Sequence, residues 1–171
     1  MGKNQAKLMQ AAIQYDHGDA ARIQHFIKVH GFASTIGTLE DLDEETQYIL
    51  ESTAILHDIG IHKSEEIYGP GIVKAHAKVG PAIAEQLLRE VGGYTDEQIE
   101  RIKYLIEHHH KYQNIDGLDY QILLEADFLV NLYEHQTEFR AIMAAQKNIF
   151  KTAAGLRLLN AMYENEFTDG E

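Results

Sequence analysis

Several histidines and aspartates of this chain have the types and the spacing of metal ligands. His57 and Asp58 are adjacent, and they follow an apolar segment that is expected to end as a helix near Gly60. A neutral imidazole nitrogen beside a carboxylate oxygen suits a borderline divalent transition metal. One such pair arises easily by chance, so the interpretation depends on partners from other helices.

Helical periodicity predicts which histidines point inward, because residues three, four and seven apart share one face of a helix. Three histidines lie on apolar faces in this way: His25 with Val29 and Phe32, His57 with Leu50 and Thr53, and His76 with Ile83 and Leu87. Two more lie at the C-terminal end of an apolar helical face near residue 110: His109 shares this face with Ile102, and His110 shares it with Ile106. His108 aligns instead with Arg101, on a solvated face.

Asp127 shares a helical face with Leu123 and Val130. An ionised carboxylate in that position is costly unless it is paired or bound to a metal. Taken singly, it or any inward histidine is more often an ordinary core residue. Taken together, five histidines and two carboxylates on separate helices are explained most simply by a shared cation. Surface or structural roles are expected for the other histidines: His17, His30, His62, His108 and His135.

The elements that must position these side chains are predicted to be helices almost throughout, since the apolar spacing is helical and only two prolines occur. We expect helices near residues 3–15, 19–36, 42–59, 72–91, 96–110, 118–134 and 136–165, where a break in the last is left open. Capping boxes are expected at 41–44 and 95–98, and helix ends at Gly60 and at Gly92-Gly93. Residues 60–71 are expected to be an irregular loop because they end in Gly-Pro-Gly.

The length of the chain suits one domain covering residues 1–171. The helical spacing predicts an all-α bundle, and the inward ligands predict a metal site between its helices. The formal charge of −12 argues against nucleic-acid polymers and anionic membranes as partners. The absence of cysteine excludes thiolate–zinc sites and disulfides. No apolar run approaches the ~18 residues of a spanning helix, so a cytoplasmic protein is expected.

In their order along the chain, these residues resemble the HD-domain family of metal-dependent phosphohydrolases, in its two-metal form. The family pattern is a histidine, then His-Asp, then further histidines, then a distal aspartate. The matching segments are residues 22–29, 54–60, 76–84, 106–110 and 124–127. The motif-bearing core therefore spans about residues 20–135, and the C-terminal helices at 136–165 follow it.

The resemblance implies two divalent metal ions, drawn from Fe, Mn, Ni, Co, Zn and Mg, with Asp58 bridging them. One ion would be held by His25, His57, Asp58 and Asp127, and the second by Asp58, His76, His109 and His110. His57 and Asp58 would be central to catalysis, in which a metal-activated bridging water attacks phosphorus. The implied substrate is a small phosphoester, with nucleotides included.

Some features separate this chain from known branches of the family. The Gly-Tyr-Pro of the branch that cleaves cyclic dinucleotides is absent after His110, and Ala21 stands near the position of a third-metal glutamate. Lys63, Lys74 and Lys111 flank the implied ligands and are the candidates for binding phosphate, although each is equally consistent with a solvated surface lysine. The ligand types also fit two other functions: an HD-fold di-iron oxygenase, and a non-enzymatic metal-binding or regulatory domain.

Overall fold

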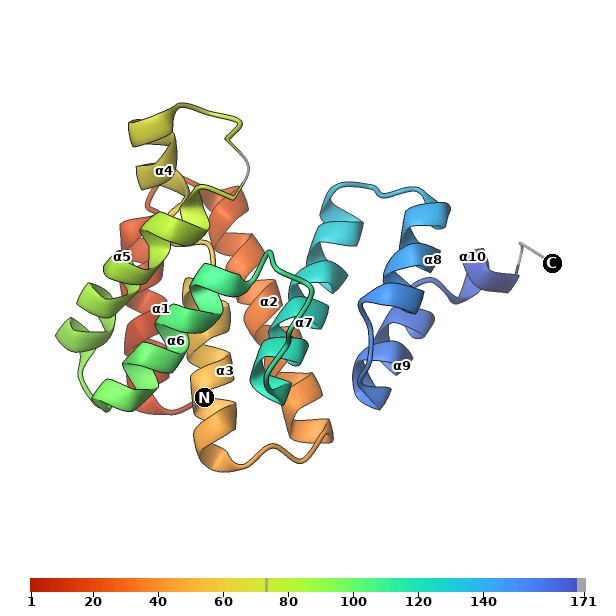
Figure 1. Cartoon of the computed structure of the whole chain (residues 1–171), viewed down its shortest axis with the longest axis horizontal. Helices are drawn as coiled ribbons and strands as arrows, with labels where there is room; N and C mark the ends of the chain where they lie inside the picture. The colour runs from red at the N-terminus through yellow and green to blue at the C-terminus, as the bar shows by residue number, and fades with distance from the viewer. Residues whose placement is uncertain (73, 169–171) are drawn as a thin grey trace.

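The computed structural model describes residues 1–72 and 74–168, and every regular element within them is a helix (Figure 1). The helices are α1 (Lys3–Tyr15), α2 (Ala20–Leu39), α3 (Glu44–Leu56), α4 (Ile61–Tyr68), α5 (His76–Val91), α6 (Asp96–His108), α7 (Leu118–Glu134), α8 (Phe139–Asn148), α9 (Ala153–Met162) and α10 (Glu164–Thr168). The all-α class that the sequence predicts is confirmed.

Two central helices, α2 and α7, join the two sides of the molecule (Figure 1). On one side lie α1, α4, α5 and α6, and on the other lie α8, α9 and α10. The closest packing is of α2 against α3 and α7, and of α5 against α6. Because α3 also contacts α6 and α7, the C-terminal end of α3 lies where the two sides meet.

Two hydrophobic clusters fill the interior. The first contains Val29, Leu50 and Leu123 together with residues of the C-terminal helices, and the second contains Ile55 and Ile102 together with residues of α1 and α5. Since α3 contributes to both clusters, residues 50–60 are all buried. Each fully buried leucine or isoleucine contributes about 1.5–3 kcal/mol to stability. The turn that carries His57 and Asp58 is therefore held inside the protein.

The helix ends agree with the sequence in part. Thr95 caps α6 in the expected capping box, and Gly92 ends α5 with a φ of 75°. At α3 the predicted start was wrong, because Asp43 and not Asp41 is the cap: the Asp43 carboxylate accepts a hydrogen bond of 2.9 Å from the Thr46 N–H. The predicted end at Gly60 was also wrong, since α3 stops at Leu56 and a turn follows.

Three segments differ more strongly from the expected elements. Residues 61–68 form α4 and not a loop, because the Gly-Pro-Gly segment ends this short helix at Gly69 without preventing it from forming. The helix expected from residue 72 begins at His76, after Lys74 adopts a φ of 75° that a helix does not permit, and residue 73 lies outside the described residues. The helix expected at 136–165 is divided into α8, α9 and α10.

The break between α8 and α9 has a tertiary cause. The Thr152 hydroxyl caps α9 by accepting from the Gly155 N–H, at 2.9 Å, and it also donates to the buried carboxylate of Glu125 in α7, at 2.8 Å. Gln121 donates to the same carboxylate at 2.8 Å. A contact across 27 residues thus determines where the C-terminal helix starts again.

Gly60 lets the turn after α3 approach the start of α5. A Cβ atom on Gly60 would meet the carbonyl oxygen of His76, and would lie 2.6 Å from the backbone nitrogen of Gly80. Both neighbours are backbone atoms, which cannot move aside as a flexible side chain would. The missing side chain therefore allows Asp58 and His76 to lie close together.

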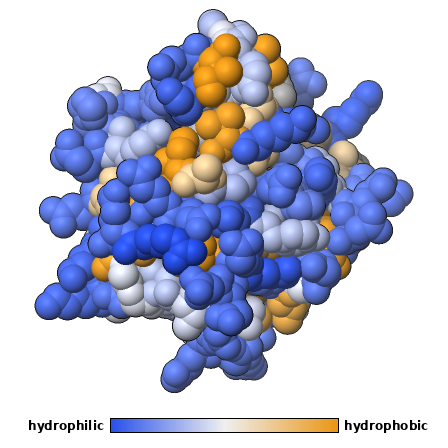
Figure 2. All heavy atoms as spheres, turned by 60° about the vertical axis from the view of Figure 1, so that its left-hand side comes forward, coloured by the Kyte–Doolittle hydropathy of each residue, from blue (hydrophilic) through white to orange (hydrophobic). Residues whose placement is uncertain are grey.

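The surface is mainly hydrophilic on the face shown in Figure 2, with one apolar patch in its upper part, at the height of α4 in Figure 1. Ile67, Tyr68 and Ile72, in α4 and the segment after it, are among the exposed large hydrophobic residues. Among the described residues, no helix has the length and apolar character needed to cross a membrane.

Gly60→Ala is expected to destabilise the protein by about 1–3 kcal/mol, the usual cost of forcing extra volume into a packed interior. Gly31→Ala is the control, because a Cβ at this position within α2 meets nothing within 4 Å. That substitution should stabilise the protein by about 0.5–1 kcal/mol, since alanine favours a helix more than glycine does. Urea unfolding of the three proteins measures both changes, and equal stability of Gly60→Ala and wild type would contradict the close approach.

Candidate metal centre

The first group of side chains comes from α2, from the turn after α3, and from α7. The His25 Nε2 atom lies 3.3 Å from His57 Nε2, 3.4 Å from Asp58 Oδ2 and 3.3 Å from Asp127 Oδ1. The His57 Nε2 atom lies 3.5 Å from Asp58 Oδ2 and 3.4 Å from Asp127 Oδ1. Bonds of about 2.0–2.2 Å place the donors of a tetrahedral metal about 3.3–3.6 Å apart. These separations therefore fit donors around one cation.

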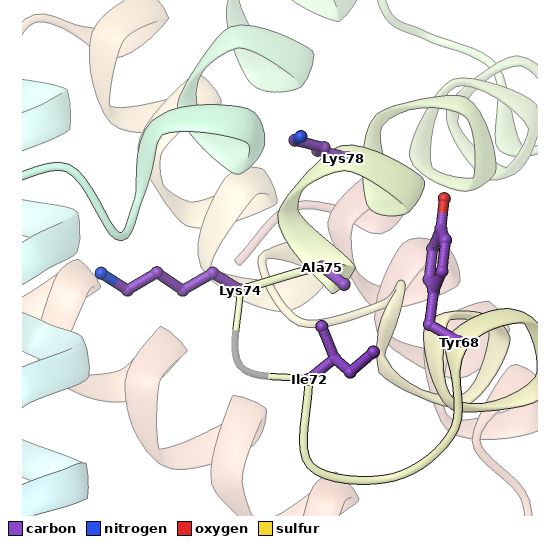
Figure 3. A pocket seen from close by; sticks show the side chains of 5 residues that line it. All are labelled: Tyr68, Ile72, Lys74, Ala75 and Lys78. Carbon is purple, nitrogen blue, oxygen red and sulfur yellow. The ribbon is translucent and has the colours of Figure 1, made fainter.

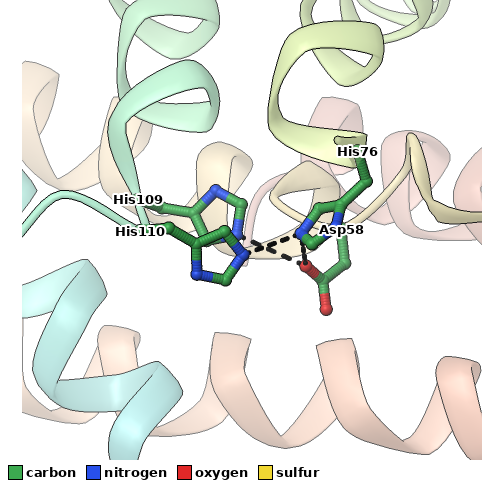
Figure 4. A group of neighbouring side chains, drawn as sticks. All are labelled: Asp58, His76, His109 and His110. Carbon is green, nitrogen blue, oxygen red and sulfur yellow. Dashed lines mark hydrogen bonds and ion pairs between the residues drawn. The ribbon is translucent and has the colours of Figure 1, made fainter. Parts of the chain in front are cut away.

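The second group comes from the same turn and from the facing ends of α5 and α6 (Figure 4). The Asp58 Oδ1 atom lies 3.1 Å from His76 Nε2 and 3.4 Å from His109 Nε2. The His110 Nε2 atom lies 2.8 Å from His76 Nε2. One potential ligand atom from each of these four residues lies within 4.8 Å of the others.

Asp58 belongs to both groups. Its Oδ2 atom faces His25 and His57, whereas its Oδ1 atom faces His76 and His109. A carboxylate that presents one oxygen to each of two donor sets is suited to bridge two cations. The structure therefore brings together all seven residues that the sequence singles out as ligands: His25, His57, Asp58, His76, His109, His110 and Asp127.

Neighbouring groups hold three of the imidazoles in the form that binds metals. The Nδ1–H groups of His57 and His109 donate to the carbonyl oxygens of Ala54 and Ile106, at 2.8 and 2.6 Å. His25 Nδ1 lies 3.0 Å from Glu134 Oε2, and so donates to a carboxylate. Because each Nδ1 carries the proton, each Nε2 has a free lone pair directed into the site.

The chemistry of this donor set fits a cation. When both rings are neutral and carry their proton on Nδ1, the Nε2 atoms of His25 and His57 face each other at 3.3 Å as two acceptors, and two acceptors cannot form a hydrogen bond. His109 Nε2 is buried and has no hydrogen-bond partner among the residues that the structure describes. A divalent metal satisfies all of these acceptors together, so the residues present fit such an ion.

Charges in the site favour a cation in the first group and a neutral imidazole at His110 in the second. Burial alone would lower the pKa of His57, but the carboxylates of Asp58 and Asp127 outweigh it and raise that pKa to about 9. Burial also opposes the ionised forms of both carboxylates, yet the surrounding imidazoles hold the pKa of each well below its usual value. Burial, together with His109 and His76, lowers the pKa of His110 to about 3.

Arg22 is a residue of the site that was not predicted from the sequence. Its Nη1 atom donates to Asp58 Oδ2 at 2.8 Å, and its Nε atom is buried without a hydrogen-bond partner among the described residues. Arg22 also lines a cleft of about 350 Å³ together with His76 and His135, which we call the arginine cleft. The sequence feature that could have indicated Arg22 is its position three residues before His25, on the same helical face.

Two more residues support the site from α7, and both follow Asp127 at helical spacing. Asn131 donates to Asp127 Oδ1 at 2.9 Å, and Glu134 receives the His25 hydrogen bond and an ion pair of 2.6 Å from Lys28. Residues four and seven positions after a ligand share its face, so periodicity could have indicated them.

The three lysines proposed from the sequence lie outside the cleft that Arg22 lines. Lys63 pairs with Glu66 at 2.9 Å on α4, and Lys111 lines a hollow with Tyr112. Lys74 lines a separate pocket of about 370 Å³ with Tyr68 and with three other residues, Ile72, Ala75 and Lys78 (Figure 3). Their role in binding phosphate remains a prediction.

None of the five histidines that were expected to have surface or structural roles belongs to either group of the described residues. The His108 ring stacks on Tyr104, with 4.0 Å between centroids, and its Nδ1–H donates to the Tyr104 carbonyl oxygen at 2.7 Å. His30 lies 3.7 Å from the buried Glu51 carboxylate. His135 has an additional position that the sequence did not indicate, because it lines the arginine cleft.

Comparison with known proteins agrees with this geometry. A family model described as HD domain matches residues 22–148. The fold is similar to a crystal structure of a predicted HD superfamily hydrolase from an uncultured Thermotogales bacterium, with a TM-score of 0.67 and 22% identity over 98% of this chain and 88% of that one. A search of curated proteins finds no significant match. Since the family model covers most of the sequence and all seven clustered residues, the chain belongs to the HD-domain family.

Proposed function

We propose that this protein is a metal-dependent phosphohydrolase that cleaves a small phosphoester or a nucleotide. The observation that carries the proposal is the Asp58 carboxylate, whose two oxygens face two separate sets of imidazoles. Membership of the HD-domain family and the fold shared with an HD superfamily hydrolase add support. The formal charge of −12 favours a small substrate over a nucleic-acid polymer, since the latter would be repelled along its length.

In this proposal two divalent cations occupy the site. The first is held by His25, His57, Asp58 and Asp127, and the second by Asp58, His76, His109 and His110. When bound, such a pair neutralises phosphoryl charge and activates a bridging water as the nucleophile. The chain has no cysteine, and the proposal requires no covalent attack by a side chain.

The chain's own residues position the substrate and orient the ligands. The Arg22 guanidinium binds a phosphoryl oxygen from the arginine cleft, while its Nη1 stays on Asp58. The carbonyl of Ala54 and the carboxylate of Glu134 keep the imidazole rings of His57 and His25 turned toward the site. Because these partners fix the rings beforehand, little reorganisation is needed when a metal or a substrate binds.

A metal analysis followed by a substrate screen tests the proposal. Wild-type protein purified without chelator should contain divalent metal, and should release phosphate from members of a phosphoester and nucleotide panel with Mn²⁺, Fe²⁺, Co²⁺ or Ni²⁺. Asp58→Asn should lose both metals and all phosphate release, because it removes the shared ligand. Asp41→Asn is the matched control, since Asp41 is exposed and adopts a φ of 55° that asparagine accepts readily.

The same experiment separates the alternative functions. Bound metal with no phosphate release across the panel would support a non-enzymatic metal-binding domain. Turnover that depends on oxygen, with a mixed-valent iron signal, would support an HD-fold oxygenase. Either result would overturn the hydrolase proposal.

His108 and His110 lie two positions apart at the end of α6, but their replacement by alanine should affect metal binding differently. His110 belongs to the second group, so its removal should weaken the second metal by at least about tenfold, the lower bound found for residues that only support a ligand. His108 stacks on Tyr104 outside the site, so its removal should leave metal content unchanged. Metal content per chain after dialysis against graded chelator measures both, and the reverse order would show that His108 is the ligand.

Metal should stabilise the fold through Asp127. A cation that binds only the folded protein adds about 2.7 kcal/mol at a hundredfold excess over its dissociation constant. In Asp127→Asn the rise in melting temperature on adding Mn²⁺ should be much smaller, because a charged ligand is lost. Thermal melts with and without chelator measure this rise, with Asp41→Asn again as the control. A wild-type response in Asp127→Asn would mean that Asp127 serves only as a partner of Asn131 and the histidines.

A further inference from the structure

A second cleft opens beside the metal groups, and Arg22 is not among its lining residues. It has a volume of about 330 Å³ and is bounded by residues that include His110, Tyr112, Asp127, Phe128, Leu132 and Ala141, and we call it the aromatic cleft. His110 belongs to one metal group and Asp127 contacts the other. A molecule held at the metals can therefore extend directly into this cleft.

The walls of the aromatic cleft suit a flat apolar group. The rings of Tyr112 and Phe128 meet edge to face, with 5.4 Å between centroids, and Leu132 and Ala141 add aliphatic surface. Aromatic walls bind other rings by stacking or edge contacts, and a volume near ~300 Å³ is typical of small-ligand sites.

The distribution of charge distinguishes this cleft from the arginine cleft. Among the described residues that line the aromatic cleft, none is a lysine or an arginine, and Asp127 brings a carboxylate. Arg22 lines the arginine cleft and gives it a fixed positive charge. His135 lines both clefts, so they meet beside the ligands. An anionic group is favoured toward Arg22, whereas the described lining of the aromatic cleft offers no lysine or arginine to a chain of further phosphates.

We propose that the aromatic cleft binds an uncharged aromatic group of the substrate, with Tyr112 and Phe128 as the specificity-determining residues. The substrate class is then a phosphomonoester of an aromatic or base-bearing alcohol, with a single phosphoryl group between the metals and Arg22. This inference rests on the proposed phosphohydrolase function.

The pocket in Figure 3 is the rival site for such a group, because it also contains a tyrosine, Tyr68. That pocket contains none of the seven clustered residues, whereas the aromatic cleft contains two. Tyr68 and Tyr112 are similarly exposed, at 53% and 43%, so truncation of either leaves the core intact and the two form a matched pair.

Binding of two non-hydrolysable probes tests the inference without requiring turnover. Phenylphosphonate and methylphosphonate carry the same anionic group, and differ only in the ring. Titration calorimetry on the Mn²⁺-loaded wild type should show phenylphosphonate binding about tenfold more tightly, a typical gain from stacking on one aromatic side chain. Tyr112→Ala should abolish this preference, and Tyr112→Phe and Tyr68→Ala should retain it. Methylphosphonate should bind all four proteins equally.

Each contrary outcome has a separate meaning. Equal binding of the two phosphonates to the wild type would overturn the inference, and so would loss of the preference in Tyr68→Ala but not in Tyr112→Ala. Failure of both phosphonates to bind the Mn²⁺-loaded protein would overturn the phosphoryl site, and with it both proposals. A retained aryl preference without phosphate release from any ester would contradict the proposed hydrolase function alone.

Discussion

The position of one carboxylate, that of Asp58, determines how the rest of the site is arranged. Its Oδ2 atom faces His25 and His57, and its Oδ1 atom faces His76 and His109, so one side chain links donors from α2, α5 and α6. Asp58 lies in the turn after α3. Gly60 completes the arrangement by letting that turn touch the backbone of α5.

Burying so many polar groups is unfavourable unless each is compensated, and the fold meets this cost in two ways. The two hydrophobic clusters on either side of α3 supply apolar burial that does not depend on the site. Backbone carbonyls of Ala54 and Ile106, together with the Glu134 carboxylate, accept hydrogen bonds from the Nδ1–H groups of three imidazoles. The remaining acceptors converge on each other, so the site is stabilised most by a cation at its centre.

The two clefts beside the metal groups differ in charge and polarity. Arg22 places a fixed positive charge in the arginine cleft, and the aromatic cleft has apolar walls with Tyr112 and Phe128. In a chain with a formal charge of −12, an anionic group has few favourable positions. In the proposed function, the metal groups and Arg22 provide one such position, which would restrict the orientation of a bound phosphoester.

The sequence by itself determined the helical class and the direction of most proposed ligands, because helical periodicity is a local property. It separated His109 and His110 from His108 by turn angle alone, and the structure places them accordingly. Only the tertiary structure decided which oxygen of Asp58 faces which group, that Arg22 reaches Asp58 from 36 residues away, and that the C-terminal helix is interrupted. These features depend on how helices distant in sequence pack together, and no local pattern encodes that packing.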